Sequence, residues 1–187
     1  MLIMGLDIMV FEKVEKSDIQ EYEDGRIHID NNFHQNPDIE PGWFNTEGES
    51  SSFRVGPYSY YNKFRDALCY AIHGVSSQEF WLNSNSYIGK PFYELIEFSD
   101  CDGVFGPQAC YKLSKDFNTT NRWKFIYYLK NGKSIANLES EESWELLEDI
   151  IKLGYDDQQD ESEFLSVYDD FMNAFQSAAG SGALMFC

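Results

Sequence analysis

Positive charge is scarce in this sequence. Its 187 residues include 14 Lys and Arg against 32 Asp and Glu, which gives a formal net charge of −18 and a pI of about 4.3. A surface this acidic repels nucleic-acid backbones and anionic membrane surfaces. We therefore expect no direct binding of nucleic acid and no membrane association. The acidity either attracts basic surfaces of other proteins or simply keeps the chain in solution.

Cysteine and long apolar runs are scarce as well. The four cysteines are Cys69, Cys101, Cys110 and Cys187, and they form no CxxC pair. Cys101 and Cys110 are nine residues apart with no histidine near either of them, so their spacing matches no zinc knuckle. No apolar run approaches the length of a membrane span. These features predict a cytoplasmic protein with free thiols.

Glycine-rich phosphate loops, internal repeats and regular βαβ alternation are also missing, but the material for a core is ample. Hydrophobic residues make up 43% of the chain and aromatic residues 17%. Apolar patterning predicts strands at residues 5–14, 26–30 and 91–98, and helices at 59–73, 107–117 and 121–130. Residues 31–52 and 76–87 have the composition of loops or connections. The order favours an α+β fold, a small sheet packed with several helices, in a single domain over residues 1–187.

The carboxylates concentrate near the C-terminal end. Residues 139–170 hold 13 Asp or Glu and one lysine, a local net charge of −12. Two amphipathic patterns predict a helical pair here, one around Trp144 to Ile151 and one from Asp160 to Gly180, so that residues 139–180 form an acidic helical part. The carboxylates that we expect to contact a partner are Glu141, Glu142, Glu145, Asp156 and Asp157.

A turn after the apolar run 92–98 is the sharpest chemical feature. Asp100-Cys101-Asp102-Gly103 resembles the DxDG turn of haloacid-dehalogenase-type phosphatases, in which a strand precedes a nucleophilic Asp, a second Asp acts as acid or base, and Mg²⁺ balances the charge. The rest of that fold's pattern does not follow in this sequence. The competing interpretation is a turn whose carboxylates bind their own backbone. We accordingly assign no catalytic residue and no cofactor, and keep Asp100 and Asp102 with Mg²⁺ as the alternative.

The few cations and the aromatic residues suggest a third possibility. Arg54 or Arg65, with a stacked Tyr58, Tyr60 or Trp81, would suit a pocket that sequesters a nucleotide or signalling molecule. The simpler expectation is that the arginines pair with neighbouring carboxylates. Trp43, in a segment with the composition of a loop, either anchors that loop on the core or provides an exposed binding hot spot.

Several stretches together resemble a family of bacterial and phage or prophage proteins with no established activity. They are GLDI at residues 5–8, the Arg54-Val-Gly56-x-Tyr58-x-x-Tyr61 block, PFYELIEFSDCDGVFGP with KLSKDF at 91–117, and FLSVYDDFMNAFQSAAGSGALMFC at 164–187. The resemblance covers most of the chain and implies a small protein of mobile genetic elements, located in the host cytosol.

Charge, aromatic content and this resemblance together predict a binding protein and not an enzyme. The expected function is inhibition or modulation of a host protein with a basic groove, such as a defence protein, through the acidic face. A metal-dependent phosphoester hydrolase and a sequestering pocket remain the alternatives. The sequence leaves the oligomeric state open.

Overall fold

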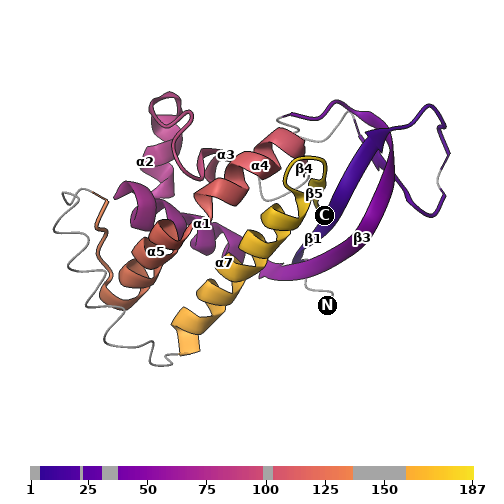
Figure 1. The fold of residues 1–187 in the computed structure, drawn as a ribbon. Helices are drawn as coiled ribbons and strands as arrows, with labels where there is room; N and C mark the ends of the chain where they lie inside the picture. The colour runs from indigo at the N-terminus through magenta and orange to yellow at the C-terminus, as the bar shows by residue number, and fades with distance from the viewer. Residues whose placement is uncertain (1–4, 22, 31–37, 99–102, 137–158) are drawn as a thin grey trace. The chain divides into compact units, whose positions relative to one another are not determined.

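The computed structural model describes residues 5–21, 23–30, 38–98, 103–136 and 159–187, drawn in colour in Figure 1. The chain divides into two compact units. The first comprises residues 1–61, 98–115 and 170–187, and the second residues 62–97 and 116–169. An antiparallel sheet and separate helices make this an α+β fold, which confirms the predicted class. One domain over residues 1–187 stays a prediction beside this division.

The first unit is built on a five-stranded sheet with the order β2-β3-β1-β5-β4, in which every pair is antiparallel. The strands are β1 (Gly5–Lys16), β2 (Arg26–Ile29), β3 (Gly42–Pro57), β4 (Gly103–Phe105) and β5 (Ala183–Phe186). The strands predicted at residues 5–14 and 26–30 are confirmed as β1 and β2. The short β4 and β5 were not predicted.

The prediction of a loop over residues 31–52 is wrong from Gly42 onward, where β3 begins. The segment is rich in Ser, Thr, Glu and Asn, but it pairs with β1 over almost its whole length. Gly48 has a φ of +86° and lies where the register shifts between Phe11 and Lys13 of β1. A bulge therefore accommodates the glycine without ending the strand, and tertiary pairing overrides the local preference for a loop.

Both faces of this sheet carry apolar side chains. Alternate residues of β1, Leu6, Ile8 and Val10, are buried on one face. Phe53 of β3 contacts Phe171 of α7 (Gln159–Ala178) edge to face, with 5.2 Å between ring centroids, so this helix covers that face. The other face holds a second cluster around Phe11, whose buried members are Phe11, Ile29, Ile39, Phe44, Val104, Ala183 and Met185.

The second unit is helical. Its elements are most of α1 (Tyr58–His73), α2 (Ser77–Leu82), the 3-10 turn η1 (Ser84–Ser86), α3 (Tyr93–Glu97), α5 (Thr119–Asn131) and the first part of α7; α4 (Pro107–Asp116) lies almost wholly in the first unit. The helices predicted at 59–73, 107–117 and 121–130 are confirmed, as is the helix that ends before Gly180. Gly74, with a φ of +73°, ends α1 as expected.

Aromatic rings form the core of the second unit. Tyr168 of α7 stacks on Phe125 of α5 at 5.2 Å between centroids and meets Phe117 at 4.7 Å. At the edge of this core, Arg122 of α5 donates two hydrogen bonds of 2.9 Å to the two carboxylate oxygens of Asp169. This bidentate pair fixes α5 against α7 within the unit.

Two predictions in the second unit are wrong. Residues 91–98 form α3 and not a strand, and residues 76–87 contain α2 and η1 and not a plain connection. The buried residues Phe92, Leu95 and Ile96 recur at helical spacing, a pattern that a short apolar run cannot separate from a strand. Ser76 caps α2 by accepting a hydrogen bond from the Glu79 N–H at 3.1 Å.

The first helix of the predicted C-terminal pair, around Trp144 to Ile151, lies outside the described residues, whereas its second helix is α7. Among the helices that the structure describes, none is long and apolar enough to cross a membrane.

Candidate functional site

The carboxylates singled out in the sequence fall outside the described part of the chain. Asp100 and Asp102 belong to the gap at 99–102, and Glu141, Glu142, Glu145, Asp156 and Asp157 belong to the gap at 137–158. Their sequence positions and charges still apply, but the structure assigns them no geometry.

The elements on either side of the Asp100–Asp102 turn differ from those of the phosphatase arrangement. The preceding segment is the helix α3, and the following one is β4, a three-residue edge strand that runs antiparallel to β5. The comparison with phosphatases depended on a strand leading into the turn. That strand is absent, so the structural support for this alternative is lost.

The beginning of α4, after the Gly106–Pro107 turn, is occupied by a carboxylate of the chain itself. Asp38 accepts hydrogen bonds from the N–H groups of Gly106 at 2.8 Å, Gln108 at 2.5 Å and Ala109 at 3.2 Å. These donors would otherwise suit a phosphate. Asp38 therefore acts as a remote helix cap, and an anion site here would require its displacement.

Arg65 is placed beside Trp81, one of the pairs considered for a nucleotide pocket, but it is 5% exposed. Its guanidinium carbon lies 5.3 Å from the centroid of the Trp81 ring, and its nitrogens donate to the Ile96 carbonyl and to the Asn62 side chain. Burial raises the pKa of nearby Glu97, and the Arg65 charge opposes that rise. Arg65 thus acts as an internal tie in the second unit.

The other two predicted binding residues lie on the sheet. The Arg54 Nε atom is 3.9 Å from the Asp7 carboxylate, and the Arg54 side chain is 55% exposed. Trp43 is half-buried on β3, with its ring 4.6 Å from that of His28. Trp43 is consequently less available to a partner than the sequence suggested.

Histidine and cysteine offer no reactive group in the second unit. The Nε2 atom of His73 is 3.0 Å from the Pro91 carbonyl oxygen, and burial lowers the pKa of the ring, with smaller effects of Lys124 and Lys90. Burial raises the pKa of the Cys69 thiol to about 12. Both groups are held in their neutral forms, which suits packing better than nucleophilic attack.

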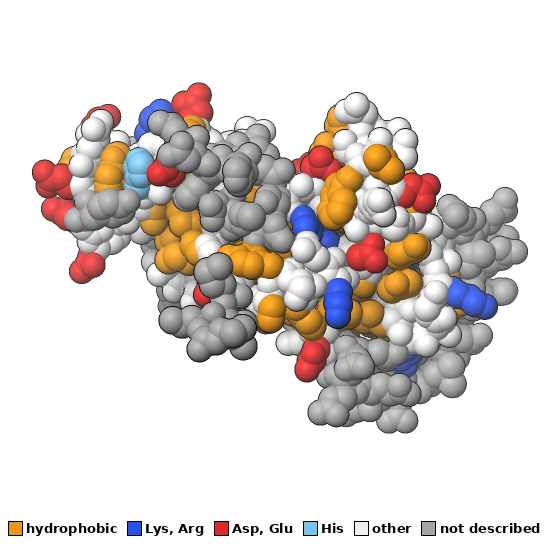
Figure 2. All heavy atoms as spheres, turned by 180° about the vertical axis from the view of Figure 1, so that it is seen from behind, with side chains coloured by type: hydrophobic (Ala, Val, Ile, Leu, Met, Phe, Trp, Pro, Cys, Tyr) orange, Lys and Arg blue, Asp and Glu red, His pale blue; other side chains and the backbone are white. Residues whose placement is uncertain are grey.

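The sequence did not predict the apolar side chains that are exposed on and after α2. Trp81 is 41% exposed, Leu82 79% and Ile88 62%. We call these three residues the α2 surface. The ring of Phe80, just before Trp81, stacks on the ring of Tyr87, just before Ile88, with 4.4 Å between centroids, so this short segment folds back on itself. Figure 2 shows hydrophobic side chains exposed over this region, with acidic side chains beside them.

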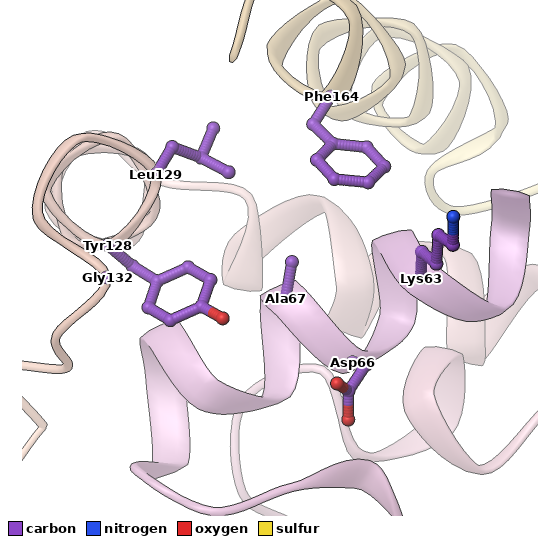
Figure 3. A pocket seen from close by; sticks show the side chains of 7 residues that line it. All are labelled: Lys63, Asp66, Ala67, Tyr128, Leu129, Gly132 and Phe164. Atoms are coloured by element: carbon purple, nitrogen blue, oxygen red, sulfur yellow. The ribbon is translucent and has the colours of Figure 1, made fainter. Parts of the chain in front are cut away.

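The second unit also contains a hollow of about 320 Å³ between three helices. Figure 3 shows Phe164 of α7 and Leu129 of α5 pointing toward the space above Ala67 of α1. Lys63 is the single cation in its lining, and Asp66 already accepts hydrogen bonds from the backbone and hydroxyl of Ser77. The lining includes no arginine, so the proposed nucleotide pocket does not form around this hollow.

Within the described ranges, no group of three or more His, Cys, Asp or Glu side chains could hold a metal ion. Comparison with protein-family models, with curated proteins and with solved structures finds no match to this chain. The function must therefore be argued from the surfaces themselves.

Proposed function

We propose that this protein acts by binding another protein. The observation that carries the proposal is the α2 surface, where Trp81, Leu82 and Ile88 are exposed within one short, well-packed segment. Large apolar side chains held in place by their own fold are typical anchors of protein interfaces. Leu82 and Ile88 are exposed too far to contribute much to the core, so their packing role is small.

The partner that fits best is basic. The chain carries a net charge of −18, and Glu79 on α2 adds a carboxylate beside Leu82. Charge of this size steers a basic partner into an encounter and disfavours acidic ones. The carboxylates of residues 139–170, including Glu141, Glu142, Glu145, Asp156 and Asp157, would strengthen this attraction.

The family resemblance narrows the proposal to a modulator or inhibitor of a host protein with a basic groove, such as a nucleic-acid-binding defence protein. In such a complex the acidic chain would compete with nucleic acid for the groove. The metal-dependent hydrolase with Mg²⁺ at Asp100 and Asp102 is the alternative, and the loss of its preceding strand leaves it weaker.

The experiment is a capture from a bacterial lysate with tagged protein, compared between wild type and a Leu82→Ser/Ile88→Ser variant. The matched control is Ile19→Ser, which removes an apolar side chain that is 51% exposed in the first unit. We expect the double variant to bind the captured partner at least about tenfold more weakly than wild type, and the control to bind it with wild-type affinity.

A second variant neutralises Glu141, Glu142, Glu145, Asp156 and Asp157 together. It should weaken capture most at low salt. Equal capture by wild type, the double variant and the neutralised variant would refute the proposal. Phosphoester turnover that requires Mg²⁺ and disappears in Asp100→Asn would replace it with the hydrolase.

A further inference from the structure

The open edge of β3 offers a second binding site in the first unit. β3 pairs with β2 only from Gly42 to Asn45, and no other strand among the described residues lies on that side of β3. The residues beyond include three consecutive serines, Ser50, Ser51 and Ser52, which are all exposed. A long strand edge of this kind is a template for pairing with another extended chain.

The direction of the backbone groups along this edge follows from the neighbouring strands. Asp7 exchanges both of its backbone hydrogen bonds with Cys187, at 3.1 and 2.9 Å, so its N–H and C=O groups point away from β3. This direction alternates along an antiparallel strand, so Ile8 and Val10 direct theirs toward β3. Their partners Phe53 and Ser51 point back at β1.

The intervening residues of β3 therefore direct their N–H and C=O groups outward. They are Ser50, Ser52 and Arg54. At one end of this stretch Gly48 forms a bulge and Glu47 is tied to Lys13 by an ion pair of 2.6 Å. At the other end the register shifts again near Leu6. Bulges and charges protect the ends of this edge, but not the stretch between them.

A hollow of about 170 Å³ lies beside the same stretch. It is lined by Val10, by Ser51 to Phe53, and by Asp170, Asn173, Ala174 and Ser177 of α7. Ser51 faces α7, because its cross-strand partner Val10 is buried on that face. A residue placed opposite Ser51 on an added strand would therefore direct its side chain toward this hollow. The lining contains one carboxylate and no cation.

We propose that an extended, basic segment of a partner protein adds to the sheet along residues 50–54 of β3. Its backbone would pair with the outward groups of Ser50 and Ser52, and a Lys or Arg opposite Ser51 would lie beside Asp170. Strand addition of this kind takes its affinity from the backbone and its specificity from alternate side chains. The inference rests on the proposed function, since it names the chemistry of one partner segment.

A second copy of the chain fits this edge less well. If β3 of a second copy paired antiparallel with this edge, the residues on the α7 face would have to meet residues of the same face. Ser51 or Phe53 of the second copy would then lie at the hollow, and its Arg54 would lie on the opposite face. Neither residue supplies a cation. Each copy would also bring a net charge of −18 to the contact, which opposes self-association.

The test uses the full chain and a labelled peptide, Thr-Val-Thr-Lys-Thr-Val-Thr, with fluorescence anisotropy for affinity and amide chemical shifts for location. Two matched peptides accompany it. One has Gln in place of Lys, and the other is N-methylated at alternate amides, so that it keeps the charge but loses the donors. We expect shifts at Ser50 and Ser52, weaker binding of the Gln peptide, and at least about tenfold weaker binding of the N-methylated peptide.

Two variants probe the protein's side of the contact. Ser52→Pro removes an N–H group that points outward, a change tolerated on edge strands, whereas Ser52→Ala keeps that group. Ser52→Pro should weaken binding about tenfold and Ser52→Ala less than twofold. Asp170→Asn should abolish the preference for the Lys peptide. If Ser52→Pro fails to fold, the N-methylated peptide still decides the question on the wild-type protein.

Equal binding of the N-methylated and parent peptides, or equal effects of Ser52→Pro and Ser52→Ala, would overturn the inference. So would a wild-type dimer that Ser52→Pro converts to a monomer, because the occupant would then be a second copy. These outcomes leave the proposed function intact as long as Leu82→Ser/Ile88→Ser still loses the captured partner. In the opposite outcome, Leu82→Ser/Ile88→Ser keeps the captured partner while the peptide still binds along β3. The proposed function would then fail and the strand-addition site would stand.

Discussion

Replacing Gly182 with alanine tests how closely the end of α7 approaches the central strand. A Cβ atom at this position would lie 2.1 Å from the Phe11 carbonyl oxygen, 2.6 Å from the Ala178 Cα and 2.8 Å from the Glu12 carbonyl oxygen. All three neighbours are backbone atoms, so no side-chain rotation can relieve the clash. The Gly182 N–H also donates to the Ala178 carbonyl at 2.9 Å, which fixes the turn from α7 into β5.

The cost follows from the distance that the backbone must move. A carbon–oxygen contact relaxes at about 3.3 Å, so β1 and the turn must separate by roughly 1 Å. Overpacking of a well-packed site costs about 1 to 3 kcal/mol, and a clash with rigid backbone belongs at the upper end. We expect Gly182→Ala to lower the free energy of unfolding by about 3 kcal/mol.

Gly132→Ala is the matched control. Gly132 has a φ of +63° and no atom within 4 Å of the added Cβ, so the change introduces backbone strain without a clash. That strain costs about 1 kcal/mol. Urea denaturation followed by circular dichroism measures both values. A cost of Gly182→Ala no larger than that of Gly132→Ala would refute the close approach of α7 to β1.

Two further predictions concern Asp38 and His73. Asp38→Ala should lower the free energy of unfolding by about 2 kcal/mol and Asp38→Asn by less, because the carboxylate caps α4 by accepting three N–H hydrogen bonds. Equal stability of Asp38→Ala and wild type in urea denaturation would contradict the cap. Burial lowers the pKa of His73, so folding favours its neutral form, and this stability is present above pH of about 6.5 and lost as the pH falls through the folded-state pKa. The difference in unfolding free energy between wild type and His73→Gln should therefore shrink from pH 7.5 to pH 5. Taking this difference cancels the opposite trend that the raised pKa of Glu97 causes in both proteins. A difference that stays constant with pH would contradict the lowered pKa of His73.

Much of the helical architecture could be predicted because its signals are local. α1 shows apolar residues at four-residue steps, and Gly74 ends it. α4 begins at Pro107, where proline is tolerated in the first turn. The strand β1 could also be predicted, because the apolar residues Leu6, Ile8 and Val10 stand at alternate positions, and the structure buries all three. Each of these segments has a preference that agrees with its final environment.

The errors arose where distant residues decide the local structure. β3 contains a serine triplet with loop-like composition, and it becomes a strand because β1 pairs with it. Phe92 adopts a φ of +58° at the beginning of α3, with its N–H bound to the Asp116 carboxylate at 2.8 Å. No signal in residues 91–98 reveals that contact, so the apolar run resembled a strand.

The candidate surfaces illustrate the same limit. Asp38 caps a helix 68 residues farther along the chain, a relation that sequence spacing cannot show. Trp81 and Leu82 belong to residues 76–87, whose composition suggested a connection, and only the folded form exposes them together with Ile88. The pairing of Arg65 with Trp81 could be proposed from residue types, but its burial, and hence its internal role, could not.

The three modes of binding considered for this chain respond differently to salt, which allows their contributions to be separated in one partner complex. Attraction by the carboxylates of residues 139–170 weakens steeply as ionic strength rises, since the Debye length falls to about 3 Å at 1 M. Burial of Leu82 and Ile88 depends on apolar area and is not screened. Backbone pairing along β3 is similarly insensitive, apart from the contribution of Asp170. The affinity that remains at high salt therefore measures the α2 surface and the β3 edge together. The loss of this affinity in Leu82→Ser/Ile88→Ser gives the contribution of the α2 surface, and the loss in Ser52→Pro gives that of the β3 edge.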